Sequence, residues 1–181
     1  MFPPKWANFG SGPDLKKEEG RDWHNFDNVA QSAGIGTDRF HVWDMTKSPV
    51  GQLEHDYTEY FEGGVLNHVI CTMNDYSAHQ VLINIHRMMK PGAVLTVIDM
   101  DLLKVFQSYL DGRIEDIPIE EGDIDDRLCF AISGYGTRDS LYTPKRMEKV
   151  LTEAGFRIIM RKEESEFDTR PKESLIFEAI K

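Results

Sequence analysis

Short apolar stretches, several of them alternating with polar residues, recur through the first half of the chain. Runs of this kind predict five strands, at residues 5–10, 21–27, 38–43, 62–73 and 93–101. Asp27 closes the second run and Asp44 follows the third. The runs at 62–73 and 93–101 are almost wholly apolar, which is typical of strands covered on both faces.

Helical spacing of apolar residues appears between and after these runs. Residues 75–89 carry it, and Lys90, Pro91 and Gly92 are expected to end that helix. A second helix is predicted at 102–112, closed by Gly112. The clearest predicted helix, at 143–156, has Thr143 as N-cap, Pro144 at the first helical position and Gly155 at its end.

Two further apolar runs, at 157–165 and 173–181, predict the last strands. Strands separated by helices indicate an α/β domain with a largely parallel sheet. The last two runs are joined by only "EFDTRPK", residues 166–172, which is too short for a parallel crossover. We therefore expect an antiparallel hairpin there. The acidic stretch 113–126 is predicted to be a loop, followed by a short helical patch within 127–143.

Composition limits the possible partners. The chain has 181 residues, which suits a single domain, and a net charge of −10, which argues against nucleic acid or an anionic membrane as the main partner. Cys71 and Cys129 lack the spacings typical of zinc sites, so no metal and no disulfide framework are expected. No signal peptide or membrane span is expected either, and together with the cysteine content this favours a cytoplasmic location.

The segment "NFGSGPD", Asn8 to Asp14, places Gly10 and Gly12 directly after the first predicted strand. Glycine lets a ligand approach the backbone, but a simple turn needs the same freedom. The segment alone leaves both interpretations open.

Several motifs resemble those of class I S-adenosylmethionine (SAM)-dependent methyltransferases. They are the early "GSGP", then "IHRMMKPGAVLTVIDMDLLKVF", "GYGTRDSLYTPKRMEKVLTEAGF" and the closing "PKESLIFEAIK". The chain is most similar to small predicted methyltransferases linked to cell-surface polysaccharide genes. The resemblance implies a Rossmann-like, seven-stranded, mostly parallel sheet with an antiparallel C-terminal hairpin. It implies one domain over 1–181, in which we expect 111–143 to form a lid.

The resemblance also implies a cofactor site for SAM at the strand ends. Its expected residues are Gly10, Ser11, Gly12, Asp27, Asp44, Met45, Thr72, Met73 and Asn74. Asp27 would accept hydrogen bonds from the ribose hydroxyls, because a carboxylate accepts two donors at once. Asp44 and Met45 would meet the adenine. For both aspartates the alternative is a turn residue at a strand end.

The acceptor side departs from the family pattern, since "CTMNDY" at 71–76 stands where we expect a segment like "SHVLEH". Methyl transfer needs a base only when the acceptor is an alcohol or a charged amine. Asp99, expected just after a strand, and Tyr135, flanked by glycines, are the predicted acceptor-side residues. Further titratable residues near strand ends are Asp75, Tyr76, His79 and Asp101. His86 is expected to be structural.

The sequence therefore predicts a SAM-dependent methyltransferase that acts on a small molecule or a glycan. The alternative is a catalytically weak or inactive relative that binds the cofactor or a protein partner. A nicotinamide-dependent Rossmann enzyme fits less well, because the chain has only "GSG" where GxGxxG is expected. The acceptor and the oligomeric state are not specified by the sequence.

Overall fold

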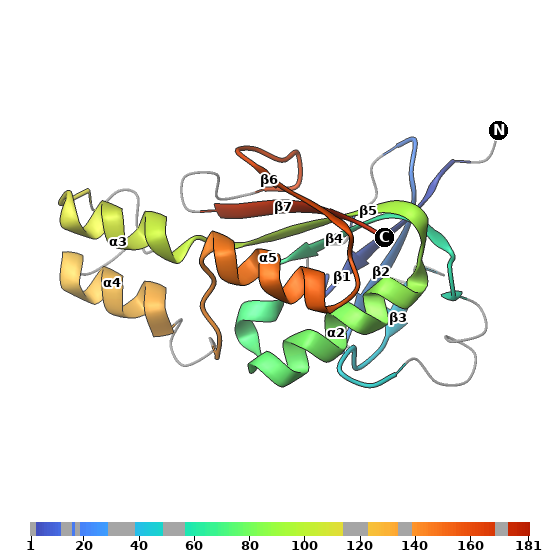
Figure 1. The fold of residues 1–181 in the computed structure, drawn as a ribbon, viewed down its shortest axis with the longest axis horizontal. Helices are drawn as coiled ribbons and strands as arrows, with labels where there is room; N and C mark the ends of the chain where they lie inside the picture. The colour runs from blue at the N-terminus through green and yellow to red at the C-terminus, as the bar shows by residue number, and fades with distance from the viewer. Residues whose placement is uncertain are drawn as a thin grey trace.

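A seven-stranded sheet forms the centre of the molecule (Figure 1). The computed structural model describes residues 3–11, 16, 19–28, 39–48, 57–113, 123–133, 139–168 and 174–181. The strands are β1 Lys5–Phe9, β2 Asp22–Asp27, β3 Phe40–Val42, β4 Phe61–Asn67, β5 Met89–Met100, β6 Ile158–Lys162 and β7 Ser174–Ile180. Their order across the sheet is β3-β2-β1-β4-β5-β7-β6.

Pairing within the sheet confirms the predicted fold class. Strands β1 to β5 pair in parallel, whereas β7 is antiparallel to both β5 and β6. Six strands therefore run in one direction and β7 runs in the other. The short connection between β6 and β7 forces this reversal, because it cannot return the chain to the starting end of the sheet.

The described helices are the 3₁₀ turn η2 Ile70–Thr72 and the α-helices α2 Asp75–Met88, α3 Leu102–Leu110, α4 Ile124–Ser133 and α5 Pro144–Glu153. The predicted start of α5 is confirmed: the Thr143 side chain accepts a hydrogen bond from the Arg146 N–H, and Pro144 is the first helical residue. None of the described helices is long and apolar enough to cross a membrane.

Two predicted boundaries around β4 and β5 are wrong. β4 ends at Asn67 instead of continuing to Met73, because His68 has a φ of +53° and leaves the extended conformation. Helix α2 ends at Met88, and β5 begins at Met89 without a separate loop. The segment 90–92 lies inside the strand, at an irregular register between β4 and β5.

Helix α4 also begins earlier than expected, within the stretch predicted to be a loop. The Asp123 carboxylate accepts hydrogen bonds from the N–H groups of Asp125 and Asp126, both at 2.9 Å. This is a side-chain cap that starts the helix within an acidic segment. α4 packs against α3 around Met100, Val105 and Ala131, and the two helices extend away from the sheet (Figure 1).

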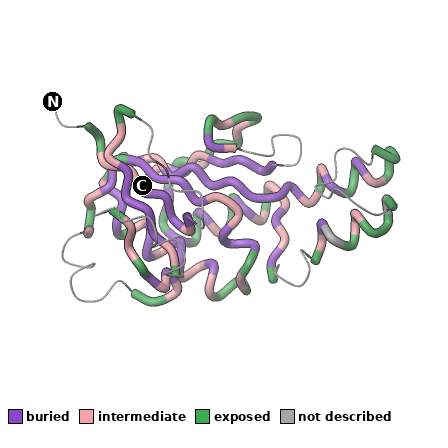
Figure 2. Tube along the Cα trace, turned by 180° about the vertical axis from the view of Figure 1, so that it is seen from behind, coloured by how far each residue is buried: buried purple, intermediate pink, exposed green. Residues whose placement is uncertain are grey.

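The main core lies between one face of the sheet and helices α2 and α5. Buried residues line this layer continuously (Figure 2), including Phe9, Phe26 and Leu95 from the strands, Leu82 from α2 and Leu151 from α5. A contiguous apolar layer of this kind supplies most of the stabilisation of an α/β domain. The strands that position the candidate site are therefore anchored from this side.

The opposite face of the sheet carries a smaller apolar cluster of Trp23, Val65, Ile98, Phe167 and Ile176, with Trp6 packed against it. No described helix contributes a residue to this cluster. A groove of about 910 Å³ runs over this face and is lined by strand residues and by the segment 162–167. It lies away from the carboxyl ends of β1 to β4, so it is not part of the site described below.

Candidate active site

The parallel strands place their carboxyl ends along one edge of the sheet. Strand order reverses between β1 and β4, because β2 and β3 lie to one side of β1, and β5 lies beyond β4. In open α/β sheets ligands bind outside this edge, at the point of reversal. The residues that follow β1, β2 and β4 therefore define the candidate site.

The glycine turn after β1 packs against the turn after β4. Gly10 and Ser11 both donate backbone hydrogen bonds to the Phe26 carbonyl, at 2.8 and 3.0 Å. Gly10 has a φ of +68°, and a Cβ there would lie 2.3 Å from Cγ2 of Val69. Gly10 is therefore required by this packing whether or not a ligand binds.

Ser11 gives the first sign of a ligand. Its side chain is buried, and its Oγ has no hydrogen-bond partner among the described residues. A buried hydroxyl without a partner is costly, so a bound polar group at this point would stabilise it. Gly12, the third residue expected here, lies outside the described residues.

Asp27 and Asp44 differ in their surroundings. Asp27 is the last residue of β2, is partly exposed, and its backbone carbonyl accepts a hydrogen bond from Trp43. The Asp44 carboxylate accepts hydrogen bonds from the backbone N–H and the hydroxyl of Thr46, at 3.1 and 2.6 Å, and pairs with Lys47. The Thr46 and Lys47 contacts hold the pKa of Asp44 below its usual value. For Asp44 the local geometry thus matches the turn alternative.

Met45 and Asn74 also have local structural contacts. The Met45 side chain is buried in the core, and its carbonyl accepts a hydrogen bond from the Asn84 amide at 2.9 Å. Asn74 is the N-cap of α2 and accepts a hydrogen bond from the Ser77 N–H. Thr72 is exposed and donates to the Val69 carbonyl, whereas Met73 packs against the core.

Asp99 lies within β5, one residue before its end, and not after the strand as expected. It is 1% exposed. Its two oxygens accept hydrogen bonds from the N–H of Met100 at 2.7 Å and the N–H of Cys71 at 3.2 Å. The carboxylate thus joins the end of β5 to the turn after β4. It also lies 3.8 Å from Nδ1 of His68.

Sequence analysis did not identify His68. It directly follows β4, in the segment "NHVICT", so the turn at the site begins three residues before "CTMNDY". If the end of β4 had been predicted at Asn67, His68 would have been the first residue after the strand and therefore a candidate site residue. The positive φ that ends β4 is a local backbone feature that the apolar pattern of 62–73 does not reveal.

Residues 139–142 pack against the turn after β4. The Asp139 and Ser140 N–H groups donate to the Cys71 carbonyl, at 2.9 and 3.1 Å. The Ser140 hydroxyl and the Arg146 guanidinium both contact Asp75, and these contacts, Ser140 first, lower the pKa of the Asp75 carboxyl. Tyr135 and much of the predicted lid 111–143 lie outside the described residues.

The remaining predicted titratable residues have other positions. Asp101 caps α3 and pairs with Arg161 at 3.1 Å, which gives it a structural role. Tyr76 is 75% exposed. His86 stacks edge-on against Phe156, as expected for a structural histidine. Tyr142, not predicted, is buried near Asp99; burial first, and then the charge of Asp99, raise the pKa of its hydroxyl.

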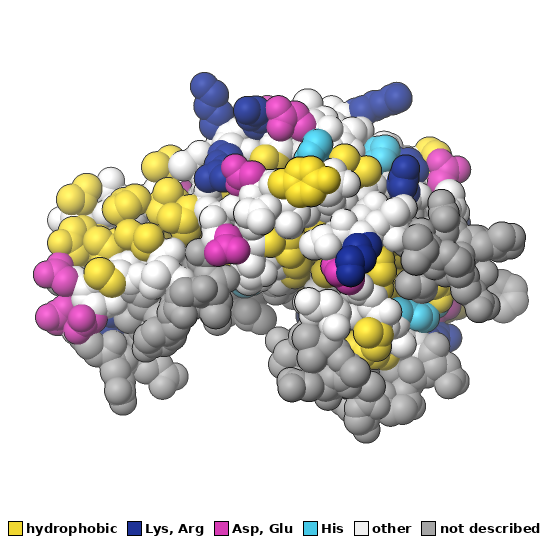
Figure 3. All heavy atoms as spheres, turned by 90° about the horizontal axis from the view of Figure 1, so that it is seen from below, with side chains coloured by type: hydrophobic (Ala, Val, Ile, Leu, Met, Phe, Trp, Pro, Cys, Tyr) yellow, Lys and Arg dark blue, Asp and Glu magenta, His cyan; other side chains and the backbone are white. Residues whose placement is uncertain are grey.

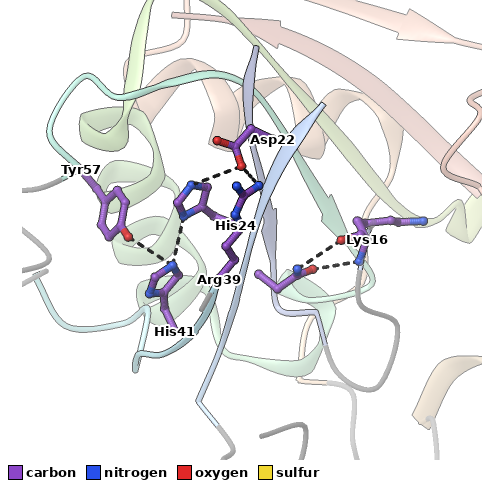
Figure 4. A network of polar contacts seen from close by, with 7 residues as sticks. Lys16, Asp22, His24, Arg39, His41 and Tyr57 are labelled. Atoms are coloured by element: carbon purple, nitrogen blue, oxygen red, sulfur yellow. Dashed lines mark hydrogen bonds and ion pairs between the residues drawn. The ribbon is translucent and has the colours of Figure 1, made fainter. Parts of the chain in front are cut away.

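A histidine cluster lies on β2 and β3, beside the main core (Figure 4). Nδ1 of His24 is 3.1 Å from Nε2 of His41, and the Tyr57 hydroxyl is 3.2 Å from the same Nε2. Asp22 lies 4.0 Å from His24 and pairs with Arg39. Burial, and then the charge of Lys5, lower the pKa of His24 to about 4. Burial, and then His24, lower the pKa of His41 to about 4.

Comparisons with known proteins give a match at the level of structure. The sequence matches no protein-family model and no curated protein. A SAM-dependent methyltransferase from Archaeoglobus fulgidus superposes with a TM-score of 0.64 at 14% identity, covering 99% of this chain and 86% of that one. Human N-acetylserotonin methyltransferase in complex with SAM gives 0.64 at 19%, covering 98% of this chain and 47% of the human one.

A third structure is the 1,6-didemethyltoxoflavin-N1-methyltransferase of Burkholderia thailandensis with bound S-adenosylhomocysteine. It superposes with a TM-score of 0.60 at 14% identity and covers 99% of this chain and 71% of that chain. This chain spans about half the length of the human enzyme. Likeness at these identities concerns architecture. The chain has the Rossmann-like fold of SAM-dependent methyltransferases.

Proposed function

We propose that the protein is a SAM-dependent methyltransferase. The observation that carries the proposal is that the β1 turn, the end of β2 at Asp27 and the β4 turn follow the carboxyl ends of strands where the strand order reverses, in a fold shared with methyltransferases. Ser11, in the β1 turn, has a buried Oγ without a hydrogen-bond partner among the described residues. These features fit a ligand that has both a polar end and vicinal hydroxyls.

Different residues of the chain would bind different parts of the cofactor. Gly10 and Ser11, with Gly12, would hold the methionine part, because close backbone approach is possible there. Asp27 would accept hydrogen bonds from the ribose hydroxyls. The adenine would lie beside Asp44 and Met45, and Thr72 to Asn74 would border the cofactor. When bound, SAM supplies an activated methyl group on a sulfonium.

The acceptor would enter between the turn after β4 and the segment 139–142. Rate enhancement would come largely from holding the acceptor atom in line with the methyl group. Asp99, fixed by two backbone N–H groups, supports the wall of this region and lies next to His68. Tyr135 and a closing lid remain predictions, as do a small-molecule or glycan acceptor and a link to cell-surface polysaccharide.

A second candidate function is cofactor binding with little or no catalysis. The specific observation in its favour is Asp44, whose carboxylate is already engaged by Thr46 and Lys47 and is less available to adenine. Such a protein would bind the cofactor or a protein partner but would not transfer the methyl group.

Calorimetry with three ligands tests these alternatives. We expect S-adenosylhomocysteine and SAM to release or absorb heat on binding, and NADH to give none. At about 100 times its dissociation constant, a bound ligand should add about 2.7 kcal/mol to the unfolding free energy. The proposal is refuted if SAM and S-adenosylhomocysteine both give no binding heat and no stabilisation of the protein. Binding without S-adenosylhomocysteine production, over a panel of thiols, alcohols and sugars, would favour the second candidate.

A further inference from the structure

Three potential metal ligands meet at the ends of β4 and β5. They are a ring nitrogen of His68, the Cys71 sulfur and an Asp99 oxygen, all within 4.8 Å of one another. Among the residues that the structure describes, no other histidine, cysteine and acidic side chains form such a group of three. The spacing of Cys71 and Cys129 predicted no metal, but the third donor comes from another strand, which sequence spacing does not show.

The His68 imidazole is the strongest indication that something binds here. Both of its ring nitrogens are buried and have no hydrogen-bond partner within the described residues. Oδ1 of Asp99 lies 3.8 Å from Nδ1 of His68, which is too long for a hydrogen bond. A buried imidazole left unpaired is costly. His68 also has a φ of +53°, a strained conformation of the kind found at functional sites.

The other two side chains can complete a site. Each Asp99 oxygen accepts one backbone hydrogen bond, so each keeps a lone pair for a further ligand. Cys71 is 3% exposed and takes no part in a disulfide. The Cys71 backbone N–H donates a hydrogen bond to the Asp99 carboxylate, which fixes the two residues relative to each other. The His68 side chain as a whole is 23% exposed, although its two ring nitrogens are buried.

We propose that His68, Cys71 and Asp99 bind a zinc-class divalent cation with one coordination position left open. Imidazole and thiolate ligands suit Zn²⁺ and disfavour Mg²⁺ and Ca²⁺, which prefer oxygen. Three protein ligands with an open fourth position are typical of catalytic zinc. The ligand atoms lie within 4.8 Å of one another, and tetrahedral zinc bonds of about 2.0–2.3 Å would draw them closer together.

The cluster belongs to the turn after β4, beside which the acceptor would enter, and this part of the inference rests on the proposed methyltransferase function. The open position would lie at that turn. It would take a thiol or hydroxyl of the acceptor and ease the loss of its proton to solvent, as zinc does for bound water. The acceptor class would then be a small thiol or alcohol, and no separate basic side chain would be needed.

Cobalt titration tests the site, because Co²⁺ replaces Zn²⁺ and reports thiolate ligation by a charge-transfer absorption. Chelator-treated protein should bind one equivalent of Co²⁺ with this absorption, and Zn²⁺ should abolish it. Cys71→Ser should lose the absorption, whereas Cys129→Ser, which changes the exposed cysteine, should keep it. His68→Asn should weaken binding about tenfold or more. Asparagine tolerates the positive φ, so this variant should remain folded.

Absence of a charge-transfer absorption at one equivalent of Co²⁺ would overturn the proposal. A Cys129→Ser variant that loses the absorption, together with a Cys71→Ser variant that keeps it, would also overturn it. The same metal-free protein is titrated with S-adenosylhomocysteine by calorimetry. Binding of that ligand without any cobalt site refutes the metal proposal and leaves the methyltransferase proposal standing. A cobalt site without S-adenosylhomocysteine binding supports the metal site and refutes the methyltransferase proposal.

Discussion

Gly10 is constrained from two directions at once. Its positive φ disfavours any other residue, and the Val69 side chain fills the space where a Cβ would go. This residue joins the turn after β1 to the turn after β4, so both sides of the candidate site depend on it.

Gly10→Ala should destabilise the protein by about 2–3 kcal/mol, since it combines backbone strain with overpacking. Urea unfolding measures the loss. Gly92→Ala is the matched control, because Gly92 has a φ of +82° but no atom within 4 Å of a Cβ position. Adding Val69→Ala should recover part of the loss in Gly10→Ala. Equal losses at Gly10 and Gly92 would show that the Val69 contact does not matter.

Asp27 is the residue on which cofactor affinity should depend. Asp27→Ala should weaken S-adenosylhomocysteine binding by about 1.5–3 kcal/mol, the size of hydrogen bonds to a charged group. Asp44→Ala should cost less affinity, because the Asp44 carboxylate is committed to Thr46 and Lys47. Calorimetry on both folded variants gives the comparison. A larger loss at Asp44 would reverse the roles assigned to these two aspartates.

At this scale the sequence located Asp27 correctly at a strand end, because alternating residues define where β2 stops. It did not reveal that Asp44 is bonded within its own turn, since that depends on the rotamers of Thr46 and Lys47. It also missed His68, whose significance comes from Asp99 on β5, a strand that follows later in the chain.

Helix α2 connects the site to the core at the scale of whole elements. Its first turn begins at the residues that border the proposed cofactor position, and its buried face packs against the sheet. Any ligand contact at Thr72 to Asn74 is thus made by the start of a firmly packed helix.

Asn74→Ala should destabilise the protein by about 1 kcal/mol, because the first turn of α2 loses its side-chain cap. Asn74→Asp should keep nearly all of the stability, since aspartate caps equally well. Thermal and urea unfolding of both variants measure this. If Asn74→Ala unfolds like the unmodified protein but binds S-adenosylhomocysteine more weakly, Asn74 acts on the cofactor and not as a cap.

Helices with clear end signals were predictable as elements, and α5 shows why: Thr143, Pro144 and Gly155 define it locally. The boundary between α2 and β5 was not predictable from local signals. Lys90 to Gly92 would end a helix in isolation, but pairing with β4 draws Met89 and the following residues into the sheet.

At the scale of the whole molecule, the resemblance to methyltransferases and the short connection at residues 166–172 predicted the directions of the strands, but not their order across the sheet. The unequal covering of the two faces was not foreseen. Apolar patterns indicate which residues are buried, but they do not say whether helices or a loop such as 163–167 do the covering. Figure 3 shows another such feature, a group of hydrophobic side chains at the α3 and α4 end, where Leu103, Phe106 and Leu110 are exposed.

The histidine cluster makes stability depend on pH. His24 and His41 have lowered pKa values of about 4 in the folded protein, against about 6.5 when unfolded. The unfolded chain therefore binds more protons below pH 6.5, and their stabilising contribution is lost as pH falls from 6.5 toward 4. Allowing for solvent screening at the partly exposed His41, the pair should cost about 2 kcal/mol between pH 7 and pH 5.

Urea unfolding at pH 7 and pH 5 measures this loss. The double variant H24Q/H41Q removes both titrating rings and should have a much smaller difference between the two pH values. An unchanged difference in that variant would assign the pH dependence to other groups.

The position of β7 affects when the sheet can be completed during synthesis of the chain. It lies inside the sheet, bonded to β5 on one side and β6 on the other, although it is synthesised after both. A ribosome exposes β1 to β5 long before β7, the strand that pairs with β5, exists, so the nascent chain must shield the unpaired edge of β5 in the meantime. Completion of the sheet must wait for Ser174–Ile180, and contacts so distant in sequence form slowly. In the cell, this protein should depend on chaperones most in the interval just before that strand emerges.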